Sequence, residues 1–354
     1  ALFALAPISA AAQVWADGDV DPGKLKPLHG LTYKVEAQAC FSKDKTPLWL
    51  NANKYGLSSL KENNGYLRGG LFRPLQTDSA RRWALGYGVD VAVPYNYTSD
   101  VVVQQAFVEG RWLHGVLTVG SKEWPMELKN NRLSSGSQTL GINARPVPQV
   151  RLALPDYWIP PFGNGWIRFK GHISYGLMTD DNWQHSFTAR KSRYADNVIY
   201  HSKAGYIKIG NEETFRPLSL ELGLEMAAVF GGTSYVPVNG KMTAMPGESG
   251  IKGFWNAFVP GGSDAGETTY KNISGDQVGS WLARINYTTD TWNFSIYADK
   301  FFEDHSGMFQ LDYNGYGSGD EWMKKKKSRF FLYDFKDIML GAELNLTYGS
   351  WLKN

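Results

Sequence analysis

The chain has 354 residues, of which 14% are aromatic and 20% charged, with 38 glycines, a net charge of +3 and one cysteine. No segment approaches the about 18 consecutive apolar residues that mark a transmembrane helix, which excludes a helical membrane protein. The positive charge is spread along the chain except at Lys324–Lys327, so a nucleic acid is a poor candidate partner, and a single cysteine excludes an internal disulfide.

The first residues have the features of the end of a signal peptide. An apolar run from Ala1 to Ile8 precedes small residues at Ser9–Ala12, so we expect residues 1–12 to be removed and Gln13 to begin the mature chain. An apolar N-terminal strand is the alternative. Residues 13–30, rich in Asp, Gly and Pro, are expected to form an exposed leader, and residues 31–354 a β-domain.

Twelve segments alternate between apolar and polar residues with a period of two, which predicts β-strands. In the first of them, Tyr33 and Val35 alternate with Lys34 and Glu36. The expected strands are Leu31–Phe41, Tyr66–Arg73, Arg82–Val93, Val101–Glu109, Trp112–Ser121, Gln149–Leu154, Gly165–Gly176, Gly205–Gly210, Leu218–Phe230, the two strands of a hairpin over Gln277–Lys300, and Asp337–Tyr348.

The hairpin Gln277–Lys300 carries one apolar and one polar face. A two-residue turn at Thr289–Asp290 would pair Tyr287 with Trp292, Ile285 with Phe294 and Ala283 with Ile296. Two environments fit such a hairpin. In a soluble sandwich the apolar face meets a second sheet, whereas in a membrane barrel it meets lipid and the polar face lines the lumen.

The connections between the expected strands alternate between long and short. The long ones are Ser42–Gly65, Lys122–Pro148, Leu177–Ala204, Gly231–Asp276 and Phe302–Lys336; the short ones are Pro74–Arg81, Gly110–Arg111, Pro155–Asn164, Asn211–Pro217 and Thr289–Asp290. Only the third strand departs from the rule, because the short Pro94–Asp100 follows it. Outer-membrane barrels have short periplasmic turns and long extracellular loops. The sequence therefore predicts an all-β, antiparallel, up-and-down transmembrane β-barrel, with more strands expected beyond this chain.

Six short segments stand out by their order and spacing: Thr46–Leu57, Asn143–Gln149, Tyr200–Lys203, Gly279–Leu282, Phe301–Ser306 and Asp334–Asp337. Together they resemble the Bacteroides-type form of the Wzi family of capsule assembly proteins. The resemblance implies an outer-membrane β-barrel that helps to hold capsular polysaccharide on the cell surface. That family also has an associated helical bundle, for which this sequence has no convincing amphipathic pattern.

Few residues are arranged for catalysis or metal binding. The six histidines lack a metal-ligand spacing, so no metal or other cofactor is expected. Glu303–Ser306 brings an acid, a base and a hydroxyl together, which would suit a hydrolase. Adjacent strand residues point to opposite faces, however, so the alternative is a polar cluster where a strand enters its loop.

The long connections hold aromatic and cationic residues suited to a sugar chain. They include Trp124, Trp183, His185, Tyr194, Trp255, Tyr313, Tyr316 and Trp322, followed by Lys324, Lys325, Lys326, Lys327 and Arg329. Aromatic faces stack on sugar rings, and cations attract acidic glycans. We expect Trp183, His185, Trp255, Tyr316, Trp322, the four lysines and Arg329 to bind polysaccharide. Alternatively, the aromatics pack an extracellular cap, and the lysines are solvated or meet lipopolysaccharide phosphates.

The sequence therefore predicts a non-enzymatic, monomeric barrel in the outer membrane of a Gram-negative bacterium. Its expected partners are an acidic capsular or surface polysaccharide, outer-membrane lipid and lipopolysaccharide. A porin-like diffusion channel is the first alternative, and an outer-membrane hydrolase that depends on His305 is the second.

Overall fold

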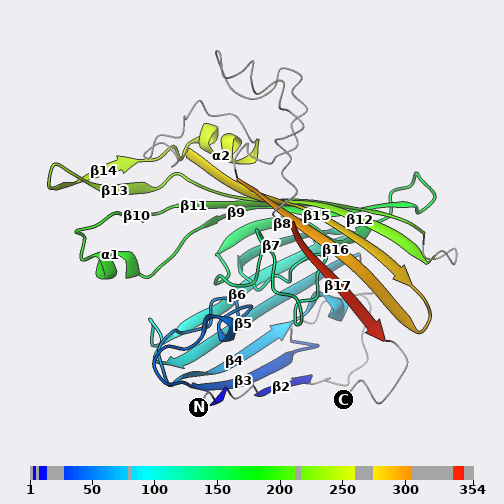
Figure 1. Ribbon diagram of the computed structural model, residues 1–354. Helices are drawn as coiled ribbons and strands as arrows, with labels where there is room; N and C mark the ends of the chain where they lie inside the picture. Colours follow the sequence, from blue (N-terminus) through cyan, green and yellow to red (C-terminus); the bar gives the residue numbers. More distant parts are fainter. Residues whose placement is uncertain are drawn as a thin grey trace. The chain divides into compact units, whose positions relative to one another are not determined.

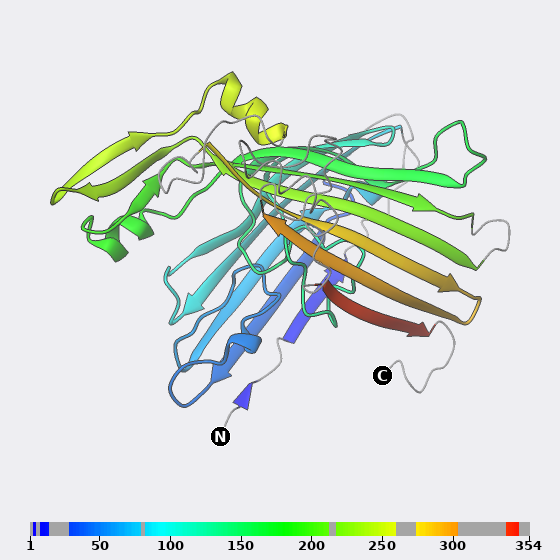
Figure 2. The same ribbon diagram turned by 45° about the horizontal axis from the view of Figure 1, so that its top comes forward.

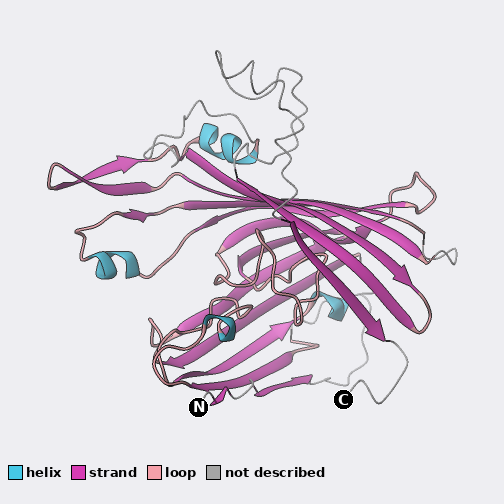
Figure 3. Cartoon of the chain, in the orientation of Figure 1, coloured by secondary structure: helices cyan, strands magenta, loops and turns pink. Residues whose placement is uncertain are grey.

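The computed structural model of this protein describes residues 3–4, 8–13, 28–78, 82–211, 217–259, 274–303 and 338–346. Most of the described regular structure is β-strand (Figure 3). The chain divides into two compact units, which we describe one at a time. The first unit holds β1 to β8 and the end of β9, and the second holds the start of β9 and the elements that follow.

The first unit consists of strands joined in chain order (Figure 1). Its elements are β1 (Phe3–Ala4), β2 (Ile8–Gln13), β3 (Thr32–Phe41), η1 (Leu48–Leu50), β4 (Asn64–Arg73), η2 (Leu75–Asp78), β5 (Trp83–Tyr95), β6 (Val102–Trp112), β7 (Gly115–Ser121) and β8 (Gln149–Trp158). Both β1 and β2 pair with β3, although residues 1–12 also have the pattern of a signal peptide.

The second unit adds two short helices to its strands. Its elements are β9 (Ile167–Leu177), α1 (Trp183–Thr188), β10 (Tyr194–Asp196), β11 (Ile199–Ile209), β12 (Leu218–Phe230), β13 (Thr233–Val238), β14 (Lys241–Pro246), α2 (Ile251–Phe258), β15 (Ser274–Thr288), β16 (Trp292–Glu303) and β17 (Ile338–Leu346). Strands β10, β13 and β14 form a separate three-stranded sheet. Neither helix among the described residues has the length and apolar character needed to cross a bilayer.

The large sheet is antiparallel and follows the chain order. Apart from the short β1 and β2, its order is β3-β4-β5-β6-β7-β8-β9-β11-β12-β15-β16-β17, which gives twelve strands among the described residues. All twelve strands expected from the sequence are therefore present. Closure of this sheet into a barrel is not detected in the described part of the chain.

Each unit places its long connections at one end of its strands. In the first unit, connections 42–63, 96–101 and 122–148 leave one end, and 74–82 and 113–114 leave the other. In the second, 178–198 and 231–273 leave one end, and 159–166, 210–217 and 289–291 leave the other. Residues 96–101 are thus a short connection at the long-loop end, which accounts for the exception in the sequence pattern.

The two faces of the sheet have inverted polarity. Val89 on β5 is 54% exposed, whereas its neighbour Asp90 is 0% exposed. The exposed apolar row includes Tyr33, Val35, Leu67, Leu71, Val103, Val108, Leu117, Val119, Val150 and Leu152 in the first unit, and Ile207, Leu222, Ile285, Phe294, Ile296, Leu340 and Leu344 in the second. The buried polar row includes Glu36, Arg68, Gln105, Glu109 and Thr118, and Glu221, Glu225, Ser280, Asn286, Ser295 and Asp299.

Two predicted turns are wrong by one to three residues. The β6–β7 turn lies at Leu113–His114 rather than Gly110–Arg111: Trp112 pairs with Gly115, and Leu113, with φ of 52°, donates its N–H to Arg82 O at 2.7 Å. The hydrogen bond from Thr289 N to Trp292 O, 2.8 Å, places the other turn at Asp290–Thr291 instead of Thr289–Asp290.

The later turn shifts the hairpin register but leaves its faces unchanged. Tyr287 pairs with Phe294, and Ile285 with Ile296, where the sequence predicted Trp292 and Phe294 as their partners. Side chains alternate with a period of two, so a shift by two residues leaves the apolar row on the same face. The rings of Tyr287 and Trp292 still stack, with centroids 5.4 Å apart.

Strands β8 and β11 extend furthest beyond the lengths that the alternation predicts. Strand β8 continues through Pro155 to Trp158. Proline is tolerated there because the pairs between β8 and β7 end at Ala153, so no hydrogen bond to β7 needs an N–H at position 155. Strand β11 begins at Ile199 rather than Gly205, since His201 and Lys203 lie on its apolar face and contact Phe258 of α2. These polar residues on the apolar face interrupt the alternation of apolar and polar residues, so the first part of β11 was not predicted.

Close packing on the polar face requires glycine at Gly223. A β-carbon there would lie 2.6 Å from Cδ1 of Tyr206, whose hydroxyl donates to Glu225 at 2.7 Å. We expect Gly223→Val to destabilise the fold by about 1–3 kcal/mol through overpacking. Gly205→Val is the matched control, since nothing lies within 4 Å of a β-carbon at Gly205. Equal urea midpoints for both variants would contradict this packing.

Candidate functional site

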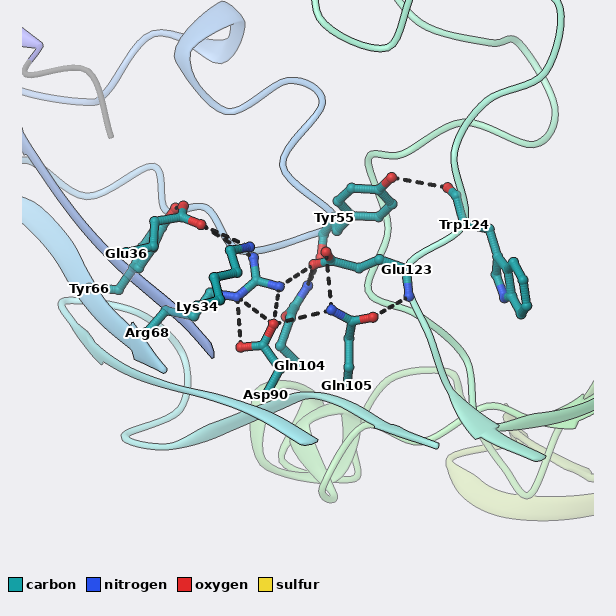
Figure 4. Close-up of polar contacts among 10 residues, drawn as sticks. All are labelled: Lys34, Glu36, Tyr55, Tyr66, Arg68, Asp90, Gln104, Gln105, Glu123 and Trp124. Carbon is teal, nitrogen blue, oxygen red and sulfur yellow. Dashed lines mark hydrogen bonds and ion pairs between the residues drawn. The ribbon is translucent and has the colours of Figure 1, made fainter. Parts of the chain in front are cut away.

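A buried cluster of charges lies on the polar face of β3, β4 and β5. Alternation places Glu36, Arg68 and Asp90 on this face, and Glu36 pairs directly with Arg68 across the two strands. Asp90 pairs with Gly70, which leaves space for the carboxylate because a β-carbon at Gly70 would lie 3.3 Å from Asp90 Cγ. Arg68 therefore occupies the centre of the cluster (Figure 4).

Arg68 contacts three carboxylates. Its Nε lies 2.8 and 2.9 Å from the two oxygens of Asp90, and its Nη2 lies 2.7 Å from Glu123 Oε1. Glu36 Oε2 is 3.8 Å from Arg68 Nη1 and 3.0 Å from Lys34 Nζ, and Glu36 also accepts a hydrogen bond from the Tyr66 hydroxyl. The cluster thus contains three carboxylates and two cations, and the Arg68 side chain is almost fully buried.

Glu123 brings the connection 122–148 onto the polar face. Its carboxylate accepts from Gln104 Nε2 at 3.0 Å and from Gln105 Nε2 at 3.3 Å, and its N–H donates to Gln105 Oε1 at 3.0 Å. In the next residue, Trp124, the ring lies 4.0 Å from the Arg151 guanidinium. The start of this long connection is therefore fixed to β6 and β8.

The connection 42–63 is held against the same face. Gln104 Nε2 donates to Tyr55 O at 2.9 Å, and the Tyr55 hydroxyl donates to Trp124 O at 3.1 Å. Leu57 is buried with Tyr66, Ala92 and Val102. Burial, followed by the negative charge of Glu123, raises the pKa of Tyr55 to about 12, so its hydroxyl stays protonated as a donor.

The second unit repeats this arrangement with residues 138–140. The backbone N–H of Gln138 donates to Asp299 Oδ2 at 3.2 Å, and the N–H of Leu140 donates to Glu225 Oε2 at 3.3 Å. The hydroxyls of Thr139 and Ser280 are 2.7 Å apart. In both units, polar strand side chains thus bind the backbone of a long connection. These hydrogen bonds hold the connections in place.

Trp183 and His185, predicted to bind polysaccharide, lie together on α1. The rings of Trp183 and Phe187 stack with centroids 4.7 Å apart, and both side chains are exposed. His185 Nε2 is 2.7 Å from Asp196 Oδ1, and its ring contacts the edge of Tyr194 at 4.7 Å. An exposed aromatic pair beside an oriented imidazole can stack on a sugar ring and bond its hydroxyls.

Trp255, predicted to belong to the same site, lies instead on α2. Its nearest aromatic contact is Phe258, with centroids 6.1 Å apart, and α2 packs on β11, β12 and β15. In both views α2 lies apart from α1, with β13 and β14 reaching away from it (Figures 1 and 2). The structure thus brings two of the predicted site residues together and leaves Trp255 separate.

The remaining predicted site residues lie outside the described residues. They are Tyr316, Trp322, Lys324, Lys325, Lys326, Lys327 and Arg329. Asp304, His305 and Ser306 of the hydrolase alternative lie outside them too.

The Arg68 cluster was not predicted from the sequence. The alternation already assigned Lys34, Glu36 and Asp90 to polar rows, and this was the available signal. Predicting that Arg68 contacts these residues requires the register of β4 against β5. The connection 74–82 contains no recognisable turn that would specify this register. Glu123 lies after β7 in a long connection, where periodicity carries no information.

No protein-family model matches this chain, and no curated protein matches it. The resemblance to capsule assembly proteins therefore stays an expectation from short sequence phrases.

Proposed function

We propose that this chain forms strands of an outer-membrane β-barrel that binds or anchors a surface polysaccharide without catalysing a reaction. The inverted polarity of the sheet carries the membrane part of the proposal. A soluble protein rarely exposes a contiguous apolar patch larger than a few hundred Å², whereas a barrel presents such a band to lipid and a polar face to its lumen. The exposed row runs along strands of both units.

The ends of the strands support the same reading. Trp83 and Trp112 pair with each other at the short-turn end of β5 and β6, and both are exposed. At the long-loop end of the first unit, Phe41 and Tyr95 are exposed. Aromatic rings flank the apolar band of a membrane barrel at both interfaces. The short turns would then be periplasmic and the long connections extracellular.

The glycan part of the proposal rests on the long-loop end. The stacked Trp183 and Phe187 offer exposed ring faces there, beside His185 held by Asp196. The resemblance to capsule assembly proteins suggests a capsular polysaccharide, and Lys324–Lys327 with Arg329 would favour an acidic one. Lipopolysaccharide phosphates are a further proposed partner of the lysines.

We expect Trp183→Ala and a Lys324–Lys327→Ser variant to reduce surface-bound capsule severalfold, because each removes sugar or charge contacts. Each lost stacking contact is worth about 0.5–1.5 kcal/mol, a severalfold change in affinity. Retained polysaccharide on whole cells is the measurement. Phe162→Ala is the control, since Phe162 is exposed at the short-turn end. Unchanged capsule in both test variants, with normal protein in the outer membrane, would remove the glycan role.

A diffusion channel is the second candidate, favoured by the charges on the polar face. Glu109, Lys122 and Arg68 line that face in the first unit. The connections 42–63 and 122–148 lie against it and would narrow a lumen. Ion conductance of the full-length protein in planar bilayers would separate a channel from an anchor.

A further inference from the structure

Helix α2 lies on the apolar face of the sheet in the second unit. His201, Ala228 and Gln277 are cross-strand partners, so they point to one face, and on β12 that face also carries Leu222 and Leu218. His201 contacts Phe258 of α2, and Gln277 Nε2 donates to Asn256 O at 2.8 Å. The helix therefore covers the long-loop end of the exposed apolar row.

The underside of α2 is fixed to the strands. Phe254 packs edge-on against Phe230 with centroids 5.1 Å apart, and a β-carbon at Gly253 would overlap Glu248 O, so glycine is required at this turn of the helix. Lys203 Nζ donates to Ala257 O at 3.2 Å and to Phe258 O, so a cation satisfies the last carbonyls of the helix. These contacts hold α2 along the sheet rather than away from it.

The outer side of α2 is apolar and exposed. Ile251 is 91% exposed and Trp255 is 61% exposed, and they lie one helical turn apart. Lys252 is exposed beside this ridge, and its ion pair with Glu248, at 3.9 Å, is long. An apolar ridge with a tryptophan and a flanking cation is the composition of a helix that lies in a membrane interface.

We infer that α2 is an interfacial helix that rests on the outer leaflet, with Ile251 and Trp255 at the boundary between headgroups and acyl chains and Lys252 toward lipid phosphate. The inference depends on the proposed membrane insertion. Continuity supports it, because α2 lies on the face that carries Leu222, Ile285 and the rest of the apolar row. Trp255 would then contact lipid rather than polysaccharide.

Depth-dependent fluorescence quenching tests this inference on the full-length protein. Cys40 and any cysteine of the full-length protein outside this chain are replaced by serine, and a fluorophore is attached at Trp255→Cys, or at Ile251→Cys if the first variant fails to fold. The protein is inserted into vesicles of phosphatidylcholine brominated at different acyl positions, with lipopolysaccharide present. Labels at Ile285→Cys and Phe187→Cys are the matched references for the apolar row and for the exposed aromatics of α1.

The α2 label should lose most fluorescence to bromines close to the headgroup, since interfacial helices sit about 5–10 Å into this boundary. The Ile285 label should be quenched by acyl-chain bromines, and the Phe187 label should not. An unquenched α2 label beside a quenched Ile285 label would overturn the inference and leave the membrane proposal intact. If neither is quenched, the membrane proposal fails as well. If only added capsular polysaccharide changes the fluorescence of the α2 label, Trp255 belongs to the glycan site and the inference is wrong.

Discussion

Replacing Val89 with arginine is expected to lower the free energy of unfolding in lipid vesicles by about 2–4 kcal/mol, the cost of this charge on the lipid face near the bilayer midplane. Val89 lies midway along β5 between the exposed rings of Trp83 and Tyr95. If the apolar row faced water instead, an exposed valine-to-arginine change would alter stability by only about 0.5 kcal/mol. Equilibrium unfolding in urea, followed by tryptophan fluorescence, measures the difference.

Tyr95→Arg is the positional control for Val89→Arg. Tyr95 lies at the long-loop end of the same strand and on the same face. The cost of an arginine falls to about 0–1 kcal/mol near the interface. A larger loss at Val89 than at Tyr95 is therefore the expected pattern, and equal small losses would contradict burial of β5 in hydrocarbon.

The second large effect is expected at Arg68. Arg68→Met would leave Asp90 and Glu123 without their shared cation in a buried site, and breaking a buried pair costs about 3–5 kcal/mol. The same change should free the connection 122–148, because Glu123 anchors it. Urea unfolding measures the first effect, and limited proteolysis between residues 124 and 148 measures the second.

Lys34→Met and a double variant sharpen the Arg68 result. Lys34 is 27% exposed and contacts only the edge of the cluster, so its loss should cost about 0–1 kcal/mol. Adding Asp90→Leu to Arg68→Met should restore part of the lost stability, because one unpaired carboxylate is removed. If Arg68→Met and Lys34→Met unfold at the same urea concentration, the cluster is solvated and does not hold the loops.

The sequence predicted the strands well because alternation records the environment of each face. In the middle of β5, for example, Val89 and Val91 flank Asp90, and the period of two is unambiguous. The prediction fails where another element changes that environment. His201 and Lys203 face α2, so the predicted start of β11, Gly205, lies six residues after its actual start at Ile199.

Turns and short helices were harder to predict for local reasons. The sequence predicted a turn at Gly110–Arg111, yet the chain turns at Leu113–His114, where Leu113 has a positive φ and donates its N–H to Arg82 O. Helix α2 has eight residues with a glycine inside, so local propensity barely favours it. Its contacts with Phe230 and Lys203, far away in sequence, stabilise it instead.

The candidate sites were predictable only in part. Aromatic residues in a long connection drew attention to Trp183 and His185, which do share a helix. The same criterion grouped them with Trp255, since composition does not record which face of the sheet a connection covers. The Arg68 cluster depends on strand register and on a loop returning to the polar face, and neither leaves a pattern in the sequence.

Photolabelling of the native protein in outer-membrane vesicles tests the central claim most directly. A carbene reagent dissolved in the lipid, with tagged residues mapped by mass spectrometry, reports which side chains meet acyl chains. We expect tags on Val35, Val89, Leu152, Ile285 and Phe294, and none on the alternate residues Glu36, Asp90, Asn286 and Ser295. Equal tagging of the two rows, or an untagged protein that leaves the vesicles without detergent, would contradict the claim that lipid covers the apolar face.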